Sequence, residues 1–139
     1  MKLSTKGRYG LRAMVDLVIN GKDDNISLKS ISERQGISMN YLEQIISILK
    51  KAGYVKSVRG AKGGYSLAKS PKDISVGDIL RALEGNLNPV DCVLVNEEKQ
   101  CNDPDCCITK VVWKKISDSI NEVVNNISLQ DLIDEHYNQ

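Results

Sequence analysis

The chain has 139 residues, of which 41% are apolar and 27% are charged, a composition typical of a globular protein. No apolar run reaches the roughly 18 residues that a membrane span needs, so we expect no membrane-spanning segment. The start, MKLSTKGRYG, is polar and basic and lacks the apolar segment of a signal peptide. The sequence therefore predicts a cytoplasmic protein.

The net charge of +1 conceals two halves of opposite sign. Residues 1–72 contain 14 Lys and Arg against 5 Asp and Glu, whereas residues 73–139 contain 5 against 13. A basic half suggests contact with a polyanion such as nucleic acid. Two solvated faces whose charges cancel would give the same totals, so charge alone does not separate the two interpretations.

The first 52 residues predict three helices. The first is expected over residues 5–19, with Thr5 as its cap and an apolar stripe along one side. Ser27 is the expected cap of a short helix over residues 28–35, which Gly36 ends, and Ser38 is the expected cap of a helix over residues 39–52. Two helices joined by so tight a turn have the spacing of a helix-turn-helix.

A β-hairpin is predicted directly after the third helix. YVKSV and YSLAK alternate like strands, and the glycine-rich, basic RGAKGG joins them. This order is the layout of a winged helix, with Arg59 and Lys62 at the tip of the wing. RGAKGG does not fit a phosphate-binding loop, because it joins two strands and no Gly-Lys-Ser or Gly-Lys-Thr follows. An ordinary hairpin turn would explain the glycines but explains the two cations less well.

The second half predicts three more helices. A helix of about nine residues is expected within ISVGDILRALEG, a long one over residues 109–127, and a last one, LQDLIDEHY, capped by Ser128. The apolar stripe of the long helix could pack on its own domain or on a second copy. We favour a dimer, because helix-turn-helix proteins usually read two half-sites with two-fold symmetry.

The predicted fold class is therefore mainly α with a small β-hairpin. A winged helix-turn-helix domain is expected over residues 1–84 and a cysteine-rich loop over residues 85–107. A dimerisation helix and a C-terminal helix are expected over residues 108–139.

All four cysteines, Cys92, Cys101, Cys106 and Cys107, lie in that polar loop. In the cytosol, clustered cysteines more often bind metal or do redox chemistry than form structural disulfides. Spacing alone favours a metal or cluster site slightly over free thiols, and it leaves zinc or oxidation of the vicinal pair open. An enzyme is a poor match, because the chain has one histidine, His136, and no recognisable acid–base or redox constellation.

Three segments resemble one bacterial family: MKLSTKGRYGLRAM, ISERQGISMNYLEQIISILKKAGYVKSVRGAKGGYSLAK and SVGDILRALEG. It is the winged-helix regulator family that includes the iron–sulfur cluster regulator IscR and the cysteine-metabolism repressor CymR. The resemblance covers essentially the whole chain. It implies a homodimeric transcription regulator, mainly a repressor, that binds double-stranded operator DNA near genes for iron–sulfur cluster assembly or cysteine metabolism.

IscR-type members hold a [2Fe–2S] cluster with three cysteines before the long helix. The resemblance therefore implies Cys92, Cys101 and Cys107 as ligands, with Cys106 a weaker candidate, although the first interval is longer than usual. Lys110 stands where the IscR type has its histidine ligand, so the fourth ligand is open. The acidic ligand of the nitric-oxide-sensing branch is also missing, because Arg8 occupies that position.

A second branch of the family offers the alternative. The cysteine-metabolism repressors resemble this chain in the DNA-binding half but lack the three-cysteine loop. The alternative is thus a cluster-free repressor controlled by thiol oxidation or by a protein partner, such as a cysteine-biosynthesis enzyme.

Family resemblance and position together predict which residues contact DNA. The third helix is expected to enter the major groove, Arg59 the minor groove, and other basic residues to bind phosphates. Glu43 would repel phosphate unless it meets a base donor, and in IscR-type regulators its equivalent restricts which sites the cluster-free form binds. The full expected set is Lys6, Arg8, Ser38, Asn40, Tyr41, Glu43, Gln44, Arg59 and Lys62.

Overall fold

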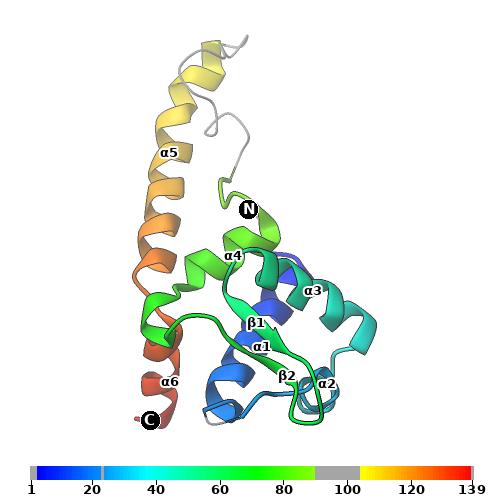
Figure 1. Ribbon diagram of the computed structural model, residues 1–139. Coiled ribbons are helices and arrows are strands. Elements are labelled where there is room, and N and C mark those ends of the chain that lie inside the picture. The colour runs from blue at the N-terminus through cyan, green and yellow to red at the C-terminus, as the bar shows by residue number, and fades with distance from the viewer. Residues whose placement is uncertain (1–2, 23, 90–103, 139) are drawn as a thin grey trace.

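The computed structural model describes residues 3–22, 24–89 and 104–138, with side chains described from residue 108 onward in the last range (Figure 1). Two antiparallel strands and six α-helices make up this part of the chain. In chain order they are α1 (Thr5–Asn20), α2 (Leu28–Gln35), α3 (Met39–Lys51), β1 (Val55–Val58), β2 (Gly64–Leu67), the short 3₁₀ helix η1 (Pro71–Asp73), α4 (Val76–Glu84), α5 (Pro104–Asn125) and α6 (Leu129–Tyr137). The predicted fold class is confirmed.

Local capping sets the turn between α2 and α3, as the sequence predicted. The Ser27 hydroxyl accepts a hydrogen bond from the Ser30 amide, and the Ser38 hydroxyl accepts one from the Tyr41 amide. Gly36 ends α2 with φ 67°, in the left-handed region that glycine adopts without steric cost. These caps satisfy backbone groups that the helices themselves leave unpaired.

The start of α1 differs from the prediction. Its N-cap is Ser4 rather than Thr5, and the Ser4 side chain makes no capping bond. A carboxylate at the C-terminal end of α4 caps α1 instead. Glu84 Oε1 accepts hydrogen bonds from the Ser4 amide at 3.1 Å and the Gly7 amide at 2.8 Å, and also from the Ser4 hydroxyl. Local pattern could not predict this cap, because its two sides lie some eighty residues apart in the chain.

The hairpin pairs Val55 with Leu67 and Val58 with Gly64. The segment before α2 adds a bridge to it, because Ile26 and Tyr65 exchange two backbone hydrogen bonds of 2.8 Å. Gly64 has φ 147°, and a Cβ there would lie 2.7 Å from the Ile26 carbonyl oxygen. Glycine is therefore required where the hairpin passes this segment.

One core joins the winged helix to the C-terminal helix. Fully buried side chains from four helices meet in the same cluster. They are Met14 of α1, Leu42 and Ile45 of α3, Ile79 of α4 and Leu129 of α6. Each such side chain contributes about 1.5–3 kcal/mol by its burial. The helix α6 is thus packed on the N-terminal half of the chain rather than separate from it.

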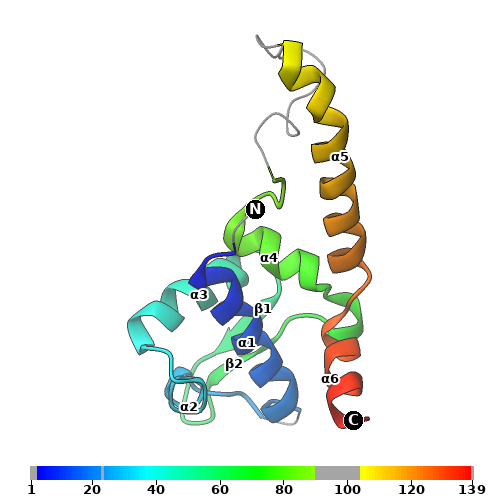
Figure 2. The same ribbon diagram turned by 180° about the vertical axis from the view of Figure 1, so that it is seen from behind.

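The long helix α5 begins at Pro104 and ends at Asn125, whereas the sequence predicted residues 109–127. Proline is favoured in the first turn of a helix, where no intrahelical donor is needed, so it permits the earlier start. The end of α5 packs on α4 through Ile120 and Val124, and its first half extends away from the rest of the described chain (Figures 1 and 2). No helix among the described residues is long and apolar enough to cross a membrane.

Candidate nucleic-acid interface and cysteine segment

The helix α3 separates a core face from a polar face. Its apolar residues Leu42, Ile45, Ile46 and Leu49 are buried. The predicted DNA-contacting residues Asn40, Glu43 and Gln44 are exposed, and their spacing of three and four places them on one helical face. Side chains on that face are free to reach base edges.

Two more exposed residues, Ser38 and Met39, lie beside this face at the start of α3. Ser38 is exposed and its hydroxyl oxygen caps the helix, which leaves the hydroxyl proton as a donor. Met39, which sequence reasoning did not single out, exposes 47% of its surface. An exposed apolar side chain beside polar groups that are predicted to read bases is suited to contact a thymine methyl group.

Tyr41 differs from its neighbours because it packs against α1. Its hydroxyl lies 3.0 Å from Thr5 Oγ1, and its ring stacks edge-on against Tyr9, with centroids 6.0 Å apart. The side chain is half-buried. These contacts hold α3 against the first turns of α1, so Tyr41 positions the reading helix.

The remaining predicted contacts lie on two other elements. Arg59 and Lys62 are exposed at the turn of the hairpin, and Asn25 donates a hydrogen bond of 3.1 Å to the Lys62 carbonyl. Arg8 is exposed and Lys6 half-buried in the first turns of α1. The structure thus presents the predicted cations on the wing and on α1.

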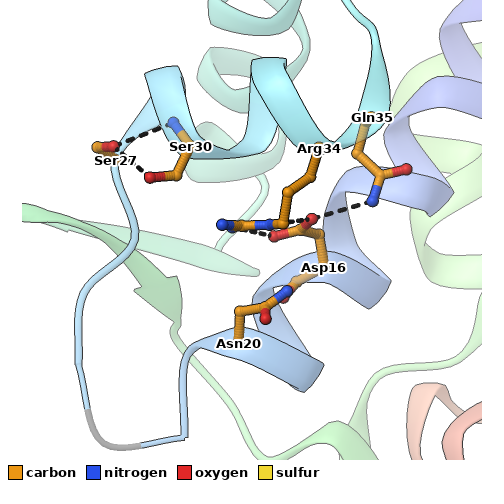
Figure 3. A network of polar contacts seen from close by, with 6 residues as sticks. All are labelled: Asp16, Asn20, Ser27, Ser30, Arg34 and Gln35. Atoms are coloured by element: carbon orange, nitrogen blue, oxygen red, sulfur yellow. Dashed lines mark hydrogen bonds and ion pairs between the residues drawn. The ribbon is translucent and has the colours of Figure 1, made fainter.

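An ion pair between a buried carboxylate and an exposed arginine fixes α2 on α1 (Figure 3). The Asp16 side chain is 1% exposed and accepts hydrogen bonds from Arg34 Nη2 at 2.7 Å, Arg34 Nε at 2.9 Å and Gln35 Nε2 at 2.9 Å. Burial raises the pKa of Asp16, but the hydrogen bonds from Arg34 and Gln35 outweigh burial, so the pKa lies below its ordinary value of 3.8. The ionised carboxylate therefore belongs to the folded state.

The cysteine segment, residues 92–107 of the predicted loop, is only partly within the described chain. Cys92 and Cys101 lie outside the described residues. Cys106 and Cys107 belong to the start of α5, with their side chains also outside the description. Lys110 is half-buried on α5, three positions after Cys107 and so on the same helical face. The set offers thiolates, the ligands that iron–sulfur clusters take, while Lys110 offers none, as the sequence indicated.

The described residues on the N-terminal side of the cysteine segment are tied to two helices. Glu84 caps α1, as described above, and Ser117 of α5 donates a hydrogen bond of 2.6 Å to Asn88 Oδ1. Burial raises the pKa of Glu84, but hydrogen bonds from Ser4 and Gly7 outweigh burial and lower it below 4.5. The cysteine segment thus begins a few residues after Glu84, which binds α1, and Asn88, which binds α5.

A helix-turn-helix followed by a hairpin, with an exposed polar face on its second helix, defines a winged-helix DNA-binding regulator of transcription, a class distinct from enzymes. The chain belongs to the Rrf2 family, whose model, described as an iron-dependent transcriptional regulator, matches residues 3–135.

Individual relatives agree with this assignment. The HTH-type transcriptional regulator IscR of Pectobacterium carotovorum is 41% identical over 133 residues, which cover 96% of this chain and 79% of that protein. The structure of CymR, the global cysteine regulator of B. subtilis, is 42% identical, with a TM-score of 0.78 and 95% of each chain covered. The structure of T. potens IscR is 48% identical, also with a TM-score of 0.78, covering 98% of this chain and 88% of that one.

Proposed function

We propose that this regulator binds operator DNA as a homodimer, mainly as a repressor, and that an iron–sulfur cluster on the cysteine segment controls the binding. Its targets would be genes of iron–sulfur cluster assembly or cysteine metabolism. The observation that carries the proposal is the position of that segment. It directly follows residues that cap α1 through Glu84 and bind α5 through Asn88.

Three cysteines would hold the cluster: Cys92, Cys101 and Cys107, with Cys106 ranked below them. Its proposed type is [2Fe–2S], as in IscR-type members. When bound, the cluster would supply a compact, charged group that orders the segment around it. Lys110 carries no lone pair when protonated, so the fourth ligand must come from elsewhere.

Glu84 could couple the conformation of the cysteine segment to the residues proposed to contact DNA. A change in the segment would act first on the end of α4, where Glu84 binds the backbone of Ser4 and Gly7. Those residues surround Lys6 and precede Arg8, two of the proposed phosphate contacts. A cluster that favours one position of Glu84 would therefore bias the start of α1, which is the two-state coupling that allosteric control requires.

The polar face of α3 would read the operator. Asn40 and Gln44 can pair with adenine, Glu43 can accept from cytosine, and Ser38 can donate to phosphate. Arg59 would enter the minor groove and Lys62 would neutralise a phosphate.

The homodimer is supported by the exposed apolar stripe on α5. Four apolar residues of α5 are exposed: Ile108 at 74%, Val112 at 50%, Ile116 at 38% and Val123 at 58%. Their helical spacing places them on one side of the helix. An apolar stripe of this length on a projecting helix is suited to a second copy of the same helix.

One observation favours a second candidate function. The chain matches CymR over 95% of both chains, which is as full a match as that to T. potens IscR. A cluster-free repressor controlled by thiol oxidation or a protein partner is therefore the alternative.

Iron and acid-labile sulfide, measured after anaerobic purification, separate the two. We expect about two irons and two sulfides per chain, with visible absorption that Cys92→Ala, Cys101→Ala or Cys107→Ala abolishes. Cys106→Ala is the matched control, with the cluster retained. Colourless protein that cannot be reconstituted would favour the CymR-like alternative.

A further inference from the structure

A pocket lies between the end of α1, the root of the hairpin and the start of α6. Its volume is about 440 Å³, within the range of small-molecule sites. Leu17 and Gly21 line it from the first side, Lys56 and Leu67 from the hairpin, and Gln130 from α6. None of the residues proposed to contact DNA or a cluster lines it, so the pocket has no role in the function proposed above.

The charged side chains that line the pocket are all cationic. They are Lys22, Lys56 and Lys69, and each is exposed. Among the described residues the structure records a single ion pair, that of Asp16 with Arg34, so no described carboxylate lies within 4 Å of these lysines. Lys69 Nζ lies over the Tyr54 ring, 5.3 Å from its centroid, while Lys22 and Lys56 have no ion-pair partner among the described residues. Three ammonium groups around one pocket create a positive potential that attracts an anion.

The neighbouring pocket has the opposite character. Four aspartates and one lysine, Lys72, line it, and it shares only Gln130 with the lysine-lined pocket. The acidic side chains therefore gather at one pocket, and the described charged lining of the other is cationic only.

The floor of the pocket is apolar. Leu17 and Val18 are 2% and 7% exposed, and Leu67 and Pro71 complete the apolar lining. The hydroxyl of Ser66, which also lines the pocket, is buried and has no hydrogen-bond partner among the described residues. Such a hydroxyl gains free energy from any partner that reaches it.

We propose that this pocket binds a small organic anion, a carboxylic acid or phosphate monoester with a short apolar tail. The acid group binds the lysines and the tail covers Leu17 and Val18. Lys56 lies opposite Ser66 in the hairpin register, so the anion binds both strands of the wing at their root. Because Gln130 of α6 lines the same pocket, the ligand bridges the wing and the C-terminal helix.

The test is a titration of the ¹⁵N-labelled full chain, followed by backbone amide shifts. The probe is 4-methylpentanoate, and its uncharged amide is the matched ligand control. We expect saturable shifts at Leu17, Gly21, Ser66 and Leu67 with the carboxylate and none with the amide. Lys56→Gln combined with Lys69→Gln should weaken binding about tenfold, because charge-assisted hydrogen bonds are lost. Lys51→Gln, an exposed lysine of α3 outside the pocket, should leave binding unchanged.

Several results would overturn the proposal. One is no saturable shift up to about 20 mM, well above the millimolar affinity scale. Others are equal binding of the amide, which would show an apolar site only, or unaltered binding in the double variant. If a short DNA duplex of random sequence shifts the same amides and displaces the carboxylate, the lysines belong to the DNA-binding surface instead. The amide spectra of each variant report its folding in the same experiment.

Discussion

At the scale of single residues, buried and capped carboxylates decide how the helices meet. Asp16 is the one charged side chain that is buried among the described residues, and Arg34 and Gln35 of α2 pair with it. An aspartate on the apolar side of α1 indicates that a cationic side chain pairs with it. The sequence alone does not identify Arg34 as this partner, because Arg34 lies 18 residues away. Glu84 was missed for the same reason.

Asp16→Asn should lower the free energy of unfolding by about 1–3 kcal/mol, because Arg34 loses its charged acceptor while the shape is kept. The folded-state pKa of Asp16 is lowered, so its contribution is present above pH 3.8 and is lost as pH falls through the folded pKa. Urea unfolding of both proteins should therefore show a gap at pH 7 that closes below pH 3.8.

Glu33→Gln is the control for this prediction, since Glu33 is exposed on the same helix as Arg34. An equal loss of stability in Glu33→Gln, or a gap that grows in acid, would contradict the role assigned to Asp16.

At the scale of elements, the sequence predicted most of the helices and both strands. Ser27, Gly36 and Ser38 set the helix-turn-helix through contacts within five residues, which pattern reading can detect. The bridge between Ile26 and Tyr65 was not predicted, because it depends on how the hairpin packs against a distant connection.

Gly64→Ala tests this bridge. The added Cβ would lie 2.7 Å from the Ile26 carbonyl oxygen, so backbone must move, and we expect a loss of about 1–3 kcal/mol in unfolding free energy. Gly60→Ala is the matched control, with positive φ but nothing within 4 Å of its Cβ. Thermal unfolding that ranks Gly60→Ala as the more harmful change would show that the bridge is unimportant.

The wing makes a separate prediction about DNA. Lys62→Gln removes one proposed phosphate contact, so the log–log slope of DNA affinity against salt should become shallower by about one unit. Fluorescence anisotropy on a duplex of random sequence measures this slope. Lys51→Gln should leave the slope unchanged, and a slope unaffected by Lys62→Gln would remove the wing from the proposed interface.

At the scale of the whole molecule, the two halves of α5 have different surroundings. Its end packs on α4 through Ile120 and Val124, whereas Ile108, Val112 and Ile116 are exposed. The sequence left packing within the chain and packing on a second copy open, because one stripe serves both. The end of α5 lies beside α4 and packs on it, whereas the first half extends away from the rest of the described chain, where a second copy could reach it.

Ile116→Glu should convert the proposed dimer to a monomer of 15.4 kDa, because a carboxylate in an apolar interface loses its hydration without a partner. Light scattering coupled to gel filtration measures the mass. Asp118→Lys is the control, since Asp118 is exposed on the other side of the helix. A wild-type chain that is monomeric at all concentrations would contradict the proposed interface.

The central claim is that a cluster on the cysteine segment controls DNA binding. The most direct measurement compares the cluster-loaded and cluster-free protein by anisotropy on duplexes selected from random DNA by the loaded form. We expect about a tenfold difference in affinity. Glu84→Gln should reduce this difference, because it weakens the contact between the end of α4 and the start of α1. Equal affinities of the loaded and cluster-free protein on every selected duplex would contradict it.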